Sequence, residues 1–80
     1  MDADMAVSGA VTLTMSNAEL VALREAIAFA DFAGDLPGRS AAETEILGRF
    51  LRTADALIPE LGTDDYDRVV SAAWTEIAAD

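Results

Sequence analysis

The sequence predicts a small, mainly α fold in which three helices follow one short N-terminal strand, in the order β-α-α-α. Two S-x-x-E patterns, at 16–19 and 40–43, are capping boxes that each open a segment of helical periodicity. Residues 63–78 repeat apolar side chains at the same spacing, and residues 10–15 alternate apolar residues with threonine. Eighty residues form one domain with a thin core. We assign 1–9 to a flexible tail and 10–80 to a single small helical domain.

The predicted strand spans residues 10–15, which read Ala-Val-Thr-Leu-Thr-Met. Alternation of period two with β-branched residues indicates a strand that has one buried face. A lone strand cannot satisfy its own backbone hydrogen bonds, so it needs a partner. Three arrangements remain open: a ribbon paired with a second copy across a twofold axis, an extended segment lying over the helices, or a local hairpin in which residues 5–7 fold back through Ser8-Gly9.

The first helix is expected from the Ser16–Glu19 capping box to about Ala33, with Gly34 as its C-terminal cap. Its apolar residues form two stripes. One stripe contains Leu20, Leu23, Ile27 and Ala30, and the other contains Val21, Ala28, Phe29 and Phe32. A helix that is apolar on two sides is normally covered on two sides. Either this helix is the middle of the bundle, or its second stripe meets a partner chain.

The second helix begins at the Ser40–Glu43 capping box, after a turn at Pro37-Gly38, and ends before Pro59. Its expected buried face is Ile46, Leu47, Phe50, Leu51, Ala54, Leu57 and Ile58. Thr63 can cap the third helix, whose stripe is Tyr66, Val69, Val70, Ala73, Trp74, Ile77 and Ala78.

The charge balance limits the possible functions. Fifteen acidic residues face five arginines, which gives a net charge of −10, and the chain has no lysine, histidine or cysteine. Disulfides, zinc fingers, cysteine nucleophiles, histidine bases and Schiff-base lysines are therefore excluded. The charge also opposes nucleic acid and anionic membranes and favours a basic protein partner, unless it serves solubility alone. No apolar run is long enough to span a bilayer and the first residues carry no cationic side chain, so we expect a cytoplasmic protein.

No motif predicts catalysis, a cofactor or a metal. Asp64, Asp65 and Asp67 lack the spacing and the glycine of an EF-hand loop. The segment 34–40 opens a helix, but its two glycines are four residues apart and an arginine replaces the lysine of a phosphate-binding loop. We expect no catalytic residue, no cofactor-binding residue and no metal ligand, and hence no enzyme.

Residues 11–15, Val-Thr-Leu-Thr-Met, resemble the strand of ribbon-helix-helix repressors and antitoxins, and residues 38–43, Gly-Arg-Ser-Ala-Ala-Glu, are similar to the turn into their second helix. The resemblance implies two strands paired across a dimer, with outward side chains that read the major groove. The outward positions here are Thr12 and Thr14, without Arg, Lys or Gln, and the first helix is about two turns too long. We do not assign the chain to that family.

These patterns favour a small, acidic, non-catalytic interaction or regulatory protein that acts through protein–protein contacts as a homodimer. The expected contact residues are Val11, Leu13, Val21, Ala28, Phe29 and Phe32. One alternative is an acidic nucleic-acid mimic that blocks a basic DNA-binding cleft, and another is a ribbon-type transcriptional regulator or antitoxin. The expected partners are a second copy and a basic protein; the charge disfavours nucleic acid, and we expect no membrane or small-molecule partner.

Overall fold

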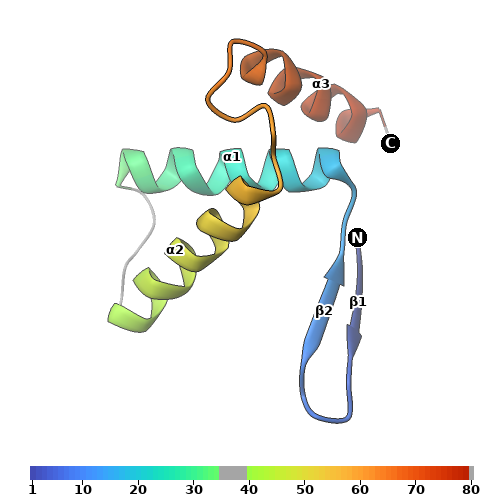
Figure 1. Cartoon of the computed structure of the whole chain (residues 1–80), viewed down its shortest axis with the longest axis vertical. Helices are drawn as coiled ribbons and strands as arrows, with labels where there is room; N and C mark the ends of the chain where they lie inside the picture. The colour runs from blue at the N-terminus through green and yellow to red at the C-terminus, as the bar shows by residue number, and fades with distance from the viewer. Residues whose placement is uncertain (35–39, 80) are drawn as a thin grey trace.

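The computed structural model describes residues 1–34 and 40–79, and it confirms the mainly α fold with β structure before three helices (Figure 1). The elements, in chain order, are β1 Asp2–Met5, β2 Val11–Thr14, α1 Asn17–Ala33, α2 Ala41–Ala56 and α3 Tyr66–Ala78. The turn expected at Pro37-Gly38 lies outside the described residues.

The two strands form an antiparallel hairpin. Its register places Asp2 opposite Thr14 and Met5 opposite Val11. The loop is closed by the Ala6 N–H, which donates to the Ala10 carbonyl oxygen at 2.8 Å, and Gly9 supplies a positive φ of 90°. A strand thus occupies part of the segment that we expected to be a tail. A partner five residues away costs little loop-closure entropy, which explains why the chain pairs locally.

Helix α1 is central, and both other helices pack on it: α3 on one side and α2 on another (Figure 1). The predicted cap is present, because the Glu19 N–H donates to Ser16 Oγ at 3.1 Å while Glu19 Oε1 accepts from the Ser16 N–H at 2.9 Å. Gly34 ends the helix at a φ of 75°. The Ser40 hydroxyl likewise caps α2 by accepting from the Glu43 N–H.

The start of α3 differs from expectation. The helix begins at Tyr66, and Thr63 lies in the turn before it. The Thr63 hydroxyl donates to the Glu60 carbonyl oxygen at 2.6 Å and accepts from the Asp65 N–H at 3.3 Å. Thr63 therefore stabilises the loop between α2 and α3 instead of capping the helix.

The core is thin and lies where α1, α3 and the end of α2 meet. Its buried residues are Ala18, Val21, Ile58, Val70 and Ala73. Four of these five are alanine or valine side chains contributed by α1 and α3, so the buried volume per residue is small. Among the described residues no helix is long and apolar enough to cross a membrane.

Candidate interaction surface

The chain exposes more surface than a compact protein of its size. Its accessible surface is 5950 Å², whereas a compact monomer of 8.4 kDa exposes about 4,600 Å². The radius of gyration is 14.1 Å, against about 12 Å for a compact chain of this length. An excess of about 1,300 Å² therefore lies on surfaces that a compact fold would cover.

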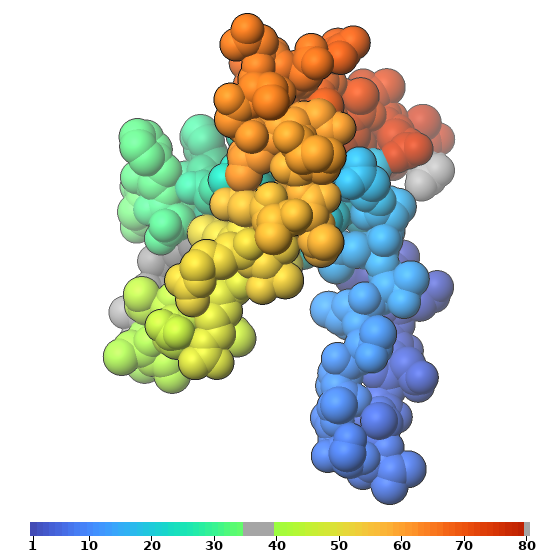
Figure 2. Space-filling model, in the orientation of Figure 1, coloured from blue at the N-terminus to red at the C-terminus, as the bar shows by residue number. Residues whose placement is uncertain are grey.

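The hairpin accounts for part of this excess, because it stands clear of the helices (Figure 2). Every residue of both strands is exposed. The register and the pleat give the hairpin two different faces. The hairpin apolar face consists of Ala3, Met5, Val11 and Leu13, and the hairpin polar face consists of Asp2, Asp4, Thr12 and Thr14.

The hairpin apolar face is uncovered in the single chain. Met5, Val11 and Leu13 remain 69%, 56% and 57% exposed. A two-stranded hairpin is marginally stable in water unless a further strand or a helix packs against it. The base of the hairpin is held to α1 by an ion pair of 3.2 Å between the Met1 amine and Glu19 Oε2. The rest of its length offers apolar side chains to a partner.

A second exposed apolar surface lies on α1 and α3. This helix patch consists of Ala26, Phe29, Phe32 and Trp74. Phe29, Phe32 and Trp74 are 70%, 92% and 54% exposed. A shallow hollow of about 310 Å³ lies between the two helices and is lined by Glu25, Ala26, Phe29 and Trp74. Exposed aromatic side chains beside a hollow are typical of protein-binding surfaces.

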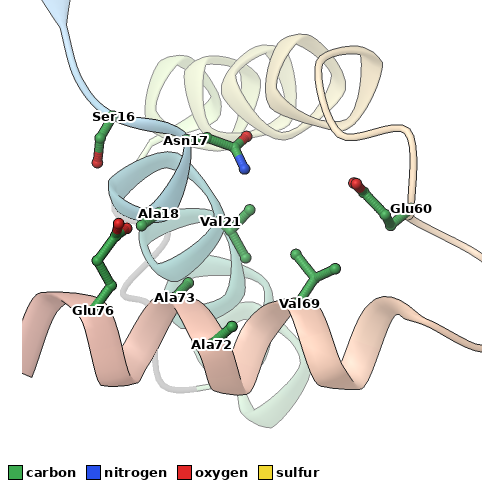
Figure 3. A pocket seen from close by; sticks show the side chains of 9 residues that line it. All are labelled: Ser16, Asn17, Ala18, Val21, Glu60, Val69, Ala72, Ala73 and Glu76. Carbon is green, nitrogen blue, oxygen red and sulfur yellow. The ribbon is translucent and has the colours of Figure 1, made fainter.

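A larger hollow of about 450 Å³ lies at the N-terminal end of α1 (Figure 3). Glu60 and Glu76 stand at its rim, and buried Val21 lies behind it. The one hydroxyl in its lining, that of Ser16, already accepts the capping hydrogen bond. The hollow is therefore lined by small apolar side chains, by two carboxylates and by a serine that caps α1.

A cluster of hydrogen-bonded polar side chains connects the three helices. Arg24 Nε donates to Asp55 Oδ1 at 2.7 Å, and Arg24 Nη1 donates to the Tyr66 hydroxyl at 3.2 Å. That hydroxyl donates to Glu25 Oε2 at 2.7 Å, and the guanidinium lies 5.7 Å from the centre of the Tyr66 ring. The cluster links α1 to α2 and to the start of α3, and each of its polar groups has a partner within the chain.

Two pKa shifts in this cluster follow from its geometry. The hydrogen bond to Asp55 raises the pKa of Arg24, so this guanidinium stays charged. Burial raises the pKa of Tyr66 above its usual 10.0, and the hydrogen bond to Glu25 adds to the shift. Both shifts hold the groups in the protonation states that join the helices, which is a structural role.

The acidic residues do not form a metal site in the part of the chain that the structure describes. Residues 1–34 and 40–79 contain no group of three or more histidine, cysteine, aspartate or glutamate side chains placed to hold a metal ion. Asp65 instead pairs with Arg68 Nη2 at 3.1 Å. The aspartates around the start of α3 therefore form a charged helix start.

The structure sorts the six expected contact residues into three groups. Val11, Leu13, Phe29 and Phe32 are exposed, and Ala28 is half-buried. The prediction for Val21 is wrong. Its side chain is 0% exposed, because the side of α1 that carries it packs against α3. The stripe containing Val21 and Phe32 thus changes from core to surface along the helix.

Met5 and Trp74 belong to these surfaces but are not among the contact residues expected from the sequence. Met5 lies beside Val11 on the hairpin apolar face, and Trp74 borders the hollow of the helix patch. The alternation of Asp2-Ala3-Asp4-Met5 is the sequence signal that could have revealed the first strand and hence Met5. Trp74 follows the helical stripe of α3, and no local pattern separates its exposed position from a buried one.

Comparison of the chain with protein-family models, with curated proteins and with solved structures gives no match in any of the three. The two exposed apolar surfaces therefore carry the functional inference.

Proposed function

We propose that this protein is non-catalytic and acts through protein–protein contacts as an acidic interaction or regulatory protein, assembled as a homodimer. The excess of about 1,300 Å² of exposed surface is the observation that carries the proposal. A stable interface needs about 800 Å² from each partner. The excess surface is therefore larger than one partner's share of such an interface, and the hairpin, with its apolar face and its free strand edge, is a self-complementary place for a second copy.

The charge supports a second, cationic protein partner for the assembled dimer. The hairpin polar face carries the carboxylates of Asp2 and Asp4, which lie opposite Thr14 and Thr12. Within a chain of net charge −10, this face attracts a basic protein surface. The absence of cysteine from the sequence suits a reducing compartment, so we place the protein in the cytoplasm.

The same face argues against a ribbon-type DNA-binding regulator. Such a regulator presents the polar face of its ribbon to the major groove. Here Asp4 lies opposite Thr12 and Asp2 lies opposite Thr14, so that face would bring two carboxylates toward the phosphates. The hairpin polar face therefore favours a protein partner over nucleic acid.

Light scattering over a range of concentrations tests the proposal, using one pair of matched variants. Leu13→Lys adds a charge to the hairpin apolar face, and Thr14→Lys adds the same charge to the opposite face of the same strand, where it lies opposite Asp2. The native chain and Thr14→Lys should both have twice the chain mass of 8.4 kDa. Leu13→Lys should have a single chain mass under the same conditions, because its charge would lie among apolar side chains of both copies.

A native chain that stays monomeric at high micromolar concentration contradicts the homodimer. Equal dissociation of Leu13→Lys and Thr14→Lys contradicts the use of the apolar face, since the added charge alone would then explain both results.

A further inference from the structure

The hairpin has two free edges, and their backbone groups point in known directions. The Ala6 N–H donates to the Ala10 carbonyl oxygen, so Ala10 directs its backbone groups inward. In an antiparallel pair this orientation alternates along the strand. Thr12 and Thr14 therefore turn their N–H and C=O groups toward β1. Val11 and Leu13 turn theirs outward, to the free edge of β2.

The two edges differ in their protection against pairing. Consider two β1 strands that pair antiparallel with their like faces on the same side. Depending on the register, Asp2 then lies opposite Asp4 of the second copy, or one of the two aspartates lies opposite its own counterpart. Like charges directly opposite are destabilising. β2 reads Val-Thr-Leu-Thr and has no charge, proline or glycine. Natural proteins protect exposed edges with charge, so β1 is protected and β2 is open.

Resting on the homodimer proposed above, we propose that β2 is the seam of the dimer. The β2 strands of two copies pair antiparallel across a twofold axis and form one sheet in the order β1-β2-β2-β1. The acidic β1 strands then lie at both outer edges of the sheet, where their charges block addition of further strands. The pairing closes the assembly at two copies.

The outward groups also fix the register of the seam. Val11 and Leu13 must meet outward groups of the second copy, so the axis passes through a residue and not between residues. An axis through Thr12 sets Val11 opposite Leu13 of the second copy, and Leu13 opposite Val11. Every outward N–H and C=O of these two residues is then paired within the bounds of β2. An axis through Leu13 would need the backbone of Met15, which lies beyond the end of the strand.

This register keeps the side chains on matching faces. Residues directly opposite one another in an antiparallel pair point to the same side of the sheet. The apolar faces of the two hairpins therefore become one continuous surface, with Val11 beside Leu13 across the seam. The polar faces likewise join, and Thr12 of each copy lies beside its own counterpart on the axis.

Single-cysteine variants test the seam by disulfide cross-linking. The chain has no cysteine of its own, so every disulfide must involve the introduced residue. Thr12→Cys should form an intermolecular disulfide under mild oxidation, since facing residues of a non-hydrogen-bonded pair have Cα atoms about 4.5 Å apart. Thr14→Cys is the matched control, on the same strand and the same face. In this register residue 14 of one copy lies opposite residue 10 of the second copy, four residues away from residue 14 of that copy. Thr14→Cys should therefore form the intermolecular disulfide at least about tenfold more slowly than Thr12→Cys.

Each other outcome overturns a defined part of the proposal. Faster cross-linking of Leu13→Cys than of Thr12→Cys overturns the register. Equal rates for Thr12→Cys and Thr14→Cys, in variants that light scattering shows to be dimeric, overturn the β2 seam and leave the homodimer intact. A native chain of single mass overturns both the seam and the proposed function.

Discussion

Arg24 Nε donates a hydrogen bond of 2.7 Å to Asp55 Oδ1, and this ion pair connects α1 to the C-terminal half of α2. The two residues are 31 positions apart in the sequence, and the Arg24 side chain is only 17% exposed. Few apolar side chains are buried between α1 and α2, because the core lies where α1, α3 and the end of α2 meet. The ion pair therefore helps to hold α2 on α1, together with the buried side chain of Ala54.

Asp55→Ala should lower the free energy of unfolding by about 1–2 kcal/mol, since it leaves a partly buried guanidinium without its main partner. Urea denaturation followed by circular dichroism measures the change. Glu45→Ala is the control, because both side chains of the Glu45–Arg49 ion pair are exposed. Loss of that pair should lower the free energy of unfolding by only about 0.3 kcal/mol. Equal losses for the two variants would show that the Arg24–Asp55 pair has no special role.

Stability should fall at alkaline pH because of Tyr66. Burial raises the pKa of its phenol in the folded state, so folding favours the neutral form. This contribution is complete below pH 10.0, the usual pKa, and is lost as the pH rises through the higher folded value. The chain has one tyrosine, so its absorbance titration in the folded and the urea-unfolded protein reports both pKa values directly.

Tyr66→Phe supplies the control for that titration. It should be less stable than the native chain near neutral pH, because Glu25 and Arg24 lose a hydrogen-bond partner. Its melting temperature should lack the alkaline step caused by the phenol. An unchanged alkaline step in Tyr66→Phe would assign the loss of stability to other groups.

Salt should not weaken the dimer. Two chains of net charge −10 repel each other, and the proposed seam joins uncharged residues. Raising the salt from about 50 to about 500 mM screens the repulsion, so the dimer dissociation constant should stay level or fall. Sedimentation equilibrium measures it. A steep rise with salt would indicate an interface made of ion pairs and would contradict a seam of uncharged residues.

The helix starts could be predicted because their signals are local. Ser16 and Glu19 satisfy each other's backbone groups within four residues, and Ser40 receives the Glu43 N–H at the same spacing. No distant contact is needed for either cap. The order of one β region and three helices therefore followed from the sequence.

Features that depend on tertiary contacts could not be predicted in the same way. The stripe on α1 that contains Val21 and Phe32 is uniform in the sequence, yet Val21 is buried against α3 and Phe32 is exposed. The path of α3 across α1 decides which part of the stripe is covered. Similarly, four residues of β1 give too short an alternation to identify a strand before its pairing with β2 is known.

Hydrogen exchange at the amides of β2 distinguishes a β2 edge that is covered by a second copy from a free one. Thr12 and Thr14 should be protected by the hairpin itself, whereas Val11 and Leu13 can be protected by a second copy alone. We expect the Val11 and Leu13 amides to exchange slowly at concentrations where the protein is dimeric and to lose that protection on dilution. Fast exchange of Val11 and Leu13 at every concentration, beside protected Thr12 and Thr14, would contradict the seam.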